Sequence, residues 1–106
     1  MVTVDQIQTG VQMAQEASQA SYAQIGERDA CGFAWVDVYG VRSNSKQGKE
    51  LIAAGFSKSY RAGVLSMWNP GKHGTQSISV KEAGADALAT YLTALGIKAY
   101  SGSRMD

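Results

Sequence analysis

Apolar and polar residues alternate with a period of two along residues 31–41, which is the pattern of a β-strand. One face of this predicted strand is made of small or β-branched residues, whereas the other is aromatic and half-polar. The small face suits helices packed closely over a sheet, and the aromatic face needs a separate explanation. The first face consists of Gly32, Ala34, Val36, Val38 and Gly40, and the second of Cys31, Phe33, Trp35, Asp37 and Tyr39.

Apolar residues recur at spacings of three, four and seven in two long stretches, which predicts two amphipathic helices. The first opens with a capping box from Thr3 to Gln6 and the second with one from Ser79 to Glu82. A shorter helix is predicted between them, with Gly55 as its stop signal. The predicted helices span residues 3–25, 45–54 and 80–95, and the predicted strands span residues 31–41, 59–68, 75–80 and 97–101.

Leaving the first helix aside, the predicted order is β-α-β-β-α-β, the order of a ferredoxin-like split β-α-β sandwich. Right-handed crossovers would place the two later helices on one face of the sheet and leave the aromatic face open. Alternatively, the long N-terminal helix folds across the aromatic face and buries it. We therefore expect one α+β domain, with an additional helix in residues 1–28, a core in residues 29–101 and a loose tail in residues 102–106.

The composition adds a prediction about the compartment. A single cysteine, Cys31, excludes an internal disulfide framework and fits a reducing environment. No apolar run approaches the roughly 20 residues of a membrane span, and no secretory signal is visible. We therefore expect a cytoplasmic protein.

Charge is distributed unevenly along the chain. Residues 1–40 carry a net charge of −4, residues 41–81 carry +6, and residues 82–106 carry −1. Such an asymmetry can mark a surface that binds anions such as nucleic-acid phosphates. The alternative is that the basic side chains point to different sides of the molecule and form no patch.

The segment Cys31 to Val38, C-G-F-A-W-V-D-V, resembles the RNP1 motif of RRM domains. The resemblance implies that Phe33 and Trp35 stack on nucleic-acid bases. Cys31 replaces the basic residue of that motif, and Val38 replaces its last aromatic residue. Independently of any family, adjacent aromatic residues on a flat sheet face can stack bases. Alternatively, Phe33 and Trp35 belong to a core beneath the first helix or to a dimer interface.

Two basic segments could hold a phosphate group. The loop at residues 69–75 is glycine-flanked and carries Lys72 and His73, but an ordinary hairpin turn is the favoured interpretation of it. The other segment, from Arg42 through Lys46, lies at the start of the second helix, where an anion could settle.

Catalysis finds little support in the sequence. His73 is the only histidine, so we expect no metal centre and no cofactor. A nucleophile pair of Cys31 and His73 is conceivable, but burial as a small apolar residue is the commoner state of such a cysteine. Asp37, a carboxylate among aromatic residues, is expected to pair with a lysine or arginine of a neighbouring strand.

Residues 30–36 together with the last four residues, Ser103 to Asp106, are similar to small tailed-phage proteins of unassigned function. This resemblance implies residence in the host cytoplasm and a binding or regulatory role. Our leading hypothesis is a module that binds single-stranded nucleic acid or a nucleotide. The alternative is a module for homodimerisation or for binding a host protein, and a small enzyme that uses His73 comes third. The candidate ligand-binding residues are Phe33, Trp35, Tyr39, Arg42, Lys46, Arg61, Lys72 and His73.

Overall fold

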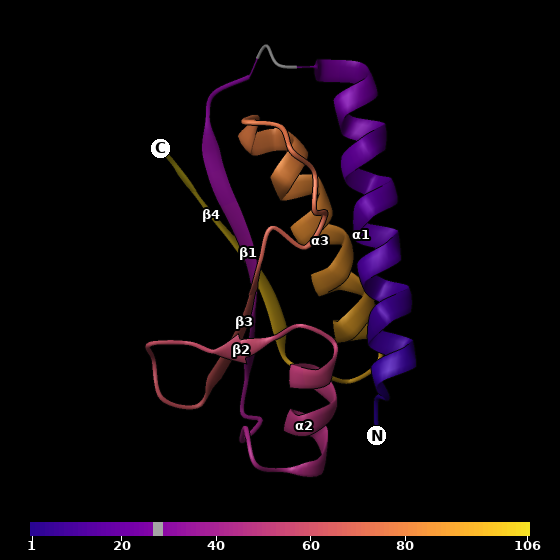
Figure 1. Cartoon of the computed structure of the whole chain (residues 1–106), viewed down its shortest axis with the longest axis vertical. Coiled ribbons are helices and arrows are strands. Elements are labelled where there is room, and N and C mark those ends of the chain that lie inside the picture. Colours follow the sequence, from indigo (N-terminus) through magenta and orange to yellow (C-terminus); the bar gives the residue numbers. More distant parts are fainter. Residues whose placement is uncertain (27–28) are drawn as a thin grey trace.

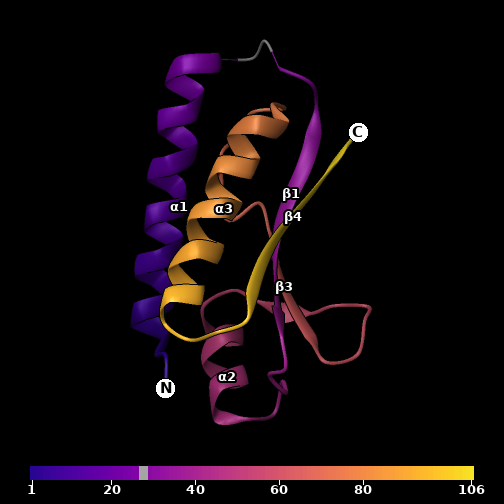
Figure 2. The same ribbon diagram turned by 180° about the vertical axis from the view of Figure 1, so that it is seen from behind.

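The computed structural model describes residues 1–26 and 29–106, and within them it contains three helices and one four-stranded antiparallel sheet. The helices lie on one side of the sheet or beyond its end (Figures 1 and 2). The predicted α+β class is confirmed. The elements are α1 (Val4–Ile25), β1 (Gly32–Tyr39), α2 (Lys46–Ala53), β2 (Ser57–Lys58), β3 (Val64–Trp68), α3 (Ile78–Ala94) and β4 (Ala99–Met105).

The sheet has the strand order β2-β3-β1-β4, with every neighbouring pair antiparallel. This arrangement is compatible with a split β-α-β fold. Strand β1 is central, and its register places Trp35 opposite Trp68 of β3 and Gly102 of β4. The helix-facing residues of β1 form the middle of the core, where Val36 and Val38 are fully buried.

Helix α1 begins with the predicted capping box. The Thr3 hydroxyl accepts a hydrogen bond from the Gln6 N–H at 3.3 Å, and the Gln6 side chain accepts one from the Thr3 N–H at 2.8 Å. The helix then runs alongside α3, on the side of α3 away from the sheet, so both helices lie on the same face of the sheet (Figures 1 and 2). The alternative in which the N-terminal helix covers the aromatic face is therefore wrong.

Small residues allow α1, α3 and the loop after β3 to approach closely. The Ser18 hydroxyl of α1 donates a hydrogen bond to the Val80 carbonyl of α3 at 2.8 Å. A Cβ atom added to Gly84 would lie 2.5 Å from the Ser18 Oγ and 2.8 Å from the Gly71 Cα. The helices can therefore pack at this separation only because these positions lack larger side chains.

Helix α3 begins earlier than the sequence predicts. Its N-cap is Ser77 rather than Ser79, so the capping box at Ser79 is wrong. Asp29 accepts hydrogen bonds from the Ser77 hydroxyl at 2.9 Å and from the Ser79 N–H at 2.7 Å. The Ser79 hydroxyl and N–H, followed by the Ser77 hydroxyl, lower the pKa of Asp29 to about 2. A distant carboxylate thus helps to set where this helix starts.

Two of the predicted strands are misplaced. Residues 75–80 are not a strand, because the serine and threonine side chains that produce the alternation serve the start of α3 instead: the Ser77 N–H donates to the Thr75 hydroxyl at 3.0 Å. The predicted strand at residues 59–68 is shortened to β3, and its hairpin partner is the two-residue β2 that precedes it. The predicted β-α-β-β-α-β order of elements along the chain is retained, but the hairpin is formed by residues nearer to the N-terminus.

The loose tail predicted for residues 102–106 is also wrong, since β4 continues to Met105. Its whole length pairs with β1, from Ala99 opposite Val38 to Met105 opposite Gly32. Backbone pairing with β1 therefore orders a segment whose own side chains give only a weak strand signal. The expected domain boundary at residue 28 lies outside the described residues. No helix in the described part of the chain is long and apolar enough to span a membrane.

Candidate functional site

The side of the sheet opposite the helices carries a group of aromatic side chains. Strand β1 contributes Phe33, Trp35 and Tyr39 at alternate positions, and β3 contributes Trp68. The ring centroids of Trp35 and Trp68 lie 4.9 Å apart, and those of Phe33 and Trp68 lie 6.1 Å apart, edge to face. Trp68 is 57% exposed. Trp68 is not among the ligand-binding residues predicted from the sequence, although it stands at the end of the predicted strand, just before the turn at residues 69–74.

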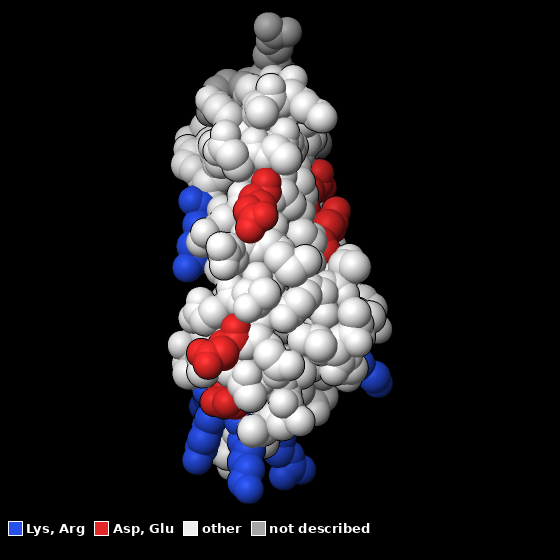
Figure 3. All heavy atoms as spheres, turned by 90° about the vertical axis from the view of Figure 1, so that its right-hand side faces the viewer, with Lys and Arg blue, Asp and Glu red and all other residues white. Residues whose placement is uncertain are grey.

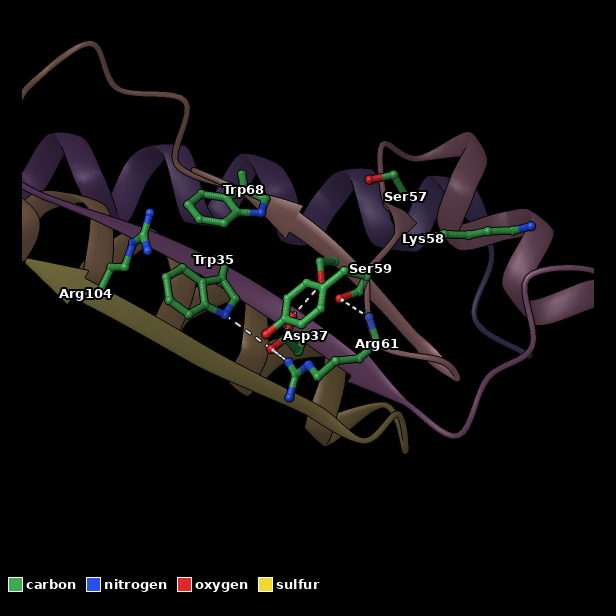
Figure 4. A pocket seen from close by; sticks show the side chains of 10 residues that line it. Trp35, Asp37, Ser57, Lys58, Ser59, Arg61, Trp68 and Arg104 are labelled. Carbon is green, nitrogen blue, oxygen red and sulfur yellow. Dashed lines mark hydrogen bonds and ion pairs between the residues drawn. The ribbon is translucent and has the colours of Figure 1, made fainter. Parts of the chain in front are cut away.

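Trp35 lies flat against the sheet because the opposing residue of β4 has no side chain. A Cβ atom at Gly102 would come within 2.6 Å of the Cε2 and Nε1 atoms of the indole. An aromatic ring over a cross-strand glycine covers the backbone that the glycine leaves bare. The indole is thereby held as one fixed part of the sheet surface, beside Trp68 (Figure 4).

Asp37 fixes the middle of this face through three hydrogen bonds (Figure 4). Its Oδ1 accepts from the Ser66 hydroxyl at 2.5 Å, and its Oδ2 accepts from Arg61 Nη2 at 2.7 Å and from Trp35 Nε1 at 3.2 Å. The carboxylate is buried, and the Arg61 side chain is 43% exposed. The predicted pairing of Asp37 with a basic residue is confirmed, although Arg61 comes from the connection between β2 and β3 rather than from a strand.

Two aromatic rings lie beside Arg61. Its Cζ lies 5.6 Å from the ring centroid of Tyr39 and 5.7 Å from that of Tyr60, which is almost fully exposed. The Tyr39 hydroxyl, together with the weaker attraction of the Asp37 carboxylate, raises the pKa of Arg61 above its ordinary value. The guanidinium is therefore a permanent cation at the edge of the aromatic group.

A hollow of about 310 Å³ lies between the tryptophans and the β2–β3 connection. Arg104 and Arg61 stand at its two ends, and Lys58 points away from it (Figure 4). With Asp37 as the acidic residue of its lining, the hollow has an excess of positive charge. Its shape and charge suit a flat ligand that carries negative groups.

A second hollow, of about 470 Å³, continues this basic surface around the β2–β3 connection. Arg42, Lys58 and Arg61 all contribute to its lining. The structure thus places Arg42 and Arg61, which lie 19 positions apart in the sequence, on the lining of the same hollow. A basic path leads from the tryptophans towards the beginning of α2.

Phe33 also has cations beside its ring. The Lys81 Nζ lies 5.3 Å from the ring centroid and the Arg104 Cζ lies 5.6 Å from it. Lys81 is held in place by a 2.9 Å hydrogen bond from its Nζ to the Gly32 carbonyl. The aromatic face therefore has a basic margin at this end as well.

The loop with Lys72 and His73 lies elsewhere, against α1. The His73 ring packs on Tyr22 with centroids 4.5 Å apart, its Nε2 lies 3.2 Å from the Gln19 Oε1, and its Nδ1 accepts from the Thr75 N–H at 3.2 Å. The Nε2 contact and the ring packing hold the loop to α1, and the Nδ1 contact binds the backbone of the loop itself. The structure therefore does not bring Lys72 and His73 together with the aromatic residues.

Lys46 is the first residue of α2, and α2 lies at the lower end of the molecule in Figure 1. Lysine and arginine side chains gather at this lower end (Figure 3). Acidic side chains lie higher on the helical side that this view shows (Figure 3). The basic residues of the segment 41–81 are therefore distributed over different parts of the molecule. Arg42 and Arg61 adjoin the aromatic face, whereas Lys72 does not.

Cys31 is exposed, so the expectation of a buried cysteine is wrong. Its backbone forms an isolated bridge with Ser77 at the end of the sheet. Among the described residues no group of three or more histidine, cysteine, aspartate or glutamate side chains could hold a metal ion.

The aromatic face with its basic ends is the candidate site of the molecule. Comparison with models of known protein families, with curated proteins and with solved structures gave no match, so similarity places the chain in no family.

Proposed function

We propose that the protein binds single-stranded nucleic acid, or a nucleotide, on the aromatic face of its sheet. The observation that carries this proposal is the pair of tryptophans, Trp35 and Trp68, side by side on a surface that no described helix covers, with Arg61 and Arg104 at its two ends. Proteins that bind single strands combine aromatic platforms for the bases with a basic groove for the backbone.

The platform has room for more than one base. Trp35 and Phe33 lie on β1, and Trp68 lies on the neighbouring strand β3, so that the two central strands both contribute rings. We further propose that the fold is ferredoxin-like, the class in which a four-stranded sheet with aromatic residues stacks two or three bases in RRM domains. The resemblance of residues 31–38 to RNP1 supports Phe33 and Trp35 as stacking residues, and the position of Trp68 supports adding it.

The phosphates would follow the basic residues at the margins. Arg104 and Lys81 lie beside Phe33, while Arg61 and Arg42 lie at the opposite end of the face. A strand crossing the tryptophans would therefore have cations at both of its exits. The exposed thiol of Cys31 supports a reducing compartment, and we propose the cytoplasm, that of a host cell if the chain is encoded by a phage.

The test is a titration of the protein with mixed-sequence single-stranded DNA at low salt, followed by tryptophan fluorescence, with the mass measured by light scattering. Trp68→Ala should weaken binding by about 1–3 kcal/mol, the usual contribution of one stacked base. Trp68 is the better choice than Trp35 because Trp35 also binds Asp37. Leu95→Ala, which removes an exposed apolar side chain of the helical side, is the matched control and should leave the affinity unchanged.

Absence of binding at micromolar protein would refute the proposal. If, in addition, Trp68→Ala dissociated a stable dimer, the aromatic face would be a protein interface, which is the alternative function. Binding that Trp68→Ala and Leu95→Ala weaken equally would place the ligand elsewhere on the molecule.

A further inference from the structure

Strand β4 has one free edge. It pairs with β1 on one side, and no segment of residues 1–26 or 29–106 pairs with it on the other. The Tyr39 N–H donates to the Lys98 carbonyl, and the Asp106 N–H donates to the Cys31 carbonyl, each at 3.0 Å. In this register the even-numbered residues of β4 direct their backbone groups towards β1. The odd-numbered residues Ser101, Ser103 and Met105 consequently direct theirs outwards.

This edge has few of the devices that usually prevent strand pairing, since Arg104 is the one charged side chain of β4. Between Ala99 and Met105 there is no proline and no lysine, and the register with β1 continues without a bulge. Within residues 1–26 and 29–106, only the first outward carbonyl has a hydrogen-bond donor, because the Thr93 hydroxyl donates to the Ala99 carbonyl at 3.1 Å. An unprotected edge of this length is a template for another strand. Figure 2 shows β4 crossing in front of β1, at the outside of the molecule.

We propose that two copies of the chain pair through β4, forming one antiparallel eight-stranded sheet about a two-fold axis. The geometry points to a register in which Ser103 faces Ser103 of the second copy and Ser101 faces Met105 of the second copy. This register uses the three outward residues of each copy as hydrogen-bonded pairs. The interface is isologous, so every contact described below occurs twice.

On the helix side of the sheet, the proposed register brings Met105 of the second copy to a hollow between α3 and β4 of the first. Met105 is 68% exposed. A hollow of about 520 Å³ lies between α3 and β4, with Ala89, Thr90 and Ser101 in its lining. Because Met105 of the second copy would stand opposite Ser101, its side chain would enter this hollow and bury both surfaces. Self-complementarity of this kind favours a second copy over an unrelated strand.

On the opposite side, the register pairs Gly102 with Arg104 of the second copy. These residues form a non-hydrogen-bonded pair, in which side chains approach most closely. The Trp35 indole lies over Gly102, so the incoming guanidinium would meet the indole and gain a cation–π contact. The two aromatic faces would then be neighbours on one continuous surface. The dimer does not depend on the proposed ligand, because none of its contacts involves a nucleotide.

Acidic residues give the interface a distinctive salt dependence. Glu82 accepts a hydrogen bond from the Ser103 hydroxyl at 2.6 Å, and Asp86 accepts one from the Ser101 hydroxyl at 2.5 Å. In the dimer these carboxylates would face those of the second copy across the axis. Added salt screens this repulsion, so dimerisation should tighten as the salt concentration rises. Binding of a nucleic acid changes in the opposite direction, so the two proposals can be tested separately.

The experiment is sedimentation equilibrium of the full chain, without nucleic acid, from low micromolar to submillimolar protein at two salt concentrations. The wild type should show a monomer–dimer equilibrium that is tighter at the higher salt. Ser103→Pro removes an outward N–H of each copy but no bond to β1, so it should weaken the dimer by about tenfold or more. Ser103→Ala keeps that N–H and is the control; its dimer should be at least as tight as that of the wild type.

A second pair of variants avoids any question of folding, since the Met105 side chain is largely exposed. Met105→Glu would bring a carboxylate next to Asp86 of the second copy and should dissociate the dimer, whereas Met105→Lys should retain it. A wild type that stays monomeric over the whole range would overturn the proposal. A dimer that Met105→Glu leaves intact would also overturn the proposal. If Trp68→Ala dissociated that dimer, the interface would lie on the aromatic face instead.

Discussion

Replacing Asp37 by alanine would test whether this buried carboxylate anchors the aromatic face. The Ser66 hydroxyl is buried and donates to Asp37 at 2.5 Å, so it would lose its acceptor. An unpaired buried hydroxyl costs about 1–3 kcal/mol. The other two donors add less, because Trp35 is only half-buried and the Arg61 side chain is 43% exposed, where water replaces the carboxylate. We expect the free energy of unfolding to fall by about 2 kcal/mol, with a fall in Tm of roughly 10 °C.

The assay is urea unfolding at neutral pH, followed by tryptophan fluorescence. Arg61→Ala should have a much smaller effect than Asp37→Ala, since it leaves the Ser66 hydroxyl and the Trp35 N–H bound to the carboxylate. The double variant Asp37→Ala/Ser66→Ala should regain part of the lost stability, because it removes the unpaired hydroxyl. If Asp37→Ala were as stable as the wild type, the carboxylate would not be the anchor. The same would follow if the double variant lost more unfolding free energy than the sum of the losses of the two single variants.

Three further predictions concern the packing and the start of α3. Asp29 has a pKa of about 2 in the folded chain against an ordinary value of 3.8, so its contribution to stability is present above pH 4 and is lost as the pH falls towards 2. Asp29→Asn should therefore flatten this part of the curve of unfolding free energy against pH, measured by urea unfolding. Gly84→Ala should reduce the free energy of unfolding by about 1–3 kcal/mol, because the new Cβ would meet Ser18, and Gly84→Ala/Ser18→Gly should lose less than the sum of the two single variants. Gly102→Val should displace the Trp35 ring, which a change in near-ultraviolet circular dichroism would reveal, and should weaken oligonucleotide binding while the far-ultraviolet spectrum stays native; an unchanged near-ultraviolet spectrum would contradict the described contact.

The features that the sequence predicts well are local ones. The alternation in residues 31–41 separates a buried small face from an aromatic face because period two is a property of the strand alone. The capping box at Thr3 needs only residues within one helical turn. The pairing of Asp37 was predictable in kind, since a buried carboxylate among aromatic rings needs a cation or several donors.

What the sequence does not predict depends on contacts between distant residues. The start of α3 moves to Ser77 because Asp29, 48 positions earlier, binds its first turn. Strand β4 is formed by pairing with β1, and its serines and glycine give little signal of their own. The association of Trp68 with Trp35 rests on the register between β1 and β3, which no single segment specifies. The sorting of basic residues between the sheet face and the far loop likewise follows from the tertiary structure.

The contact between the two tryptophans has a spectroscopic consequence. Trp35 and Trp68 are the only tryptophans of the chain, and their ring centroids are 4.9 Å apart at a tilt of 34°. Chromophores this close and not parallel share their excited states, so the pair should produce an exciton couplet in circular dichroism that neither ring gives alone. The couplet requires β1 and β3 to be in register, and a ring inserted between the indoles would abolish it. The chain therefore carries its own label-free reporter of strand pairing during folding, and of whether a ligand separates the indoles or leaves them together.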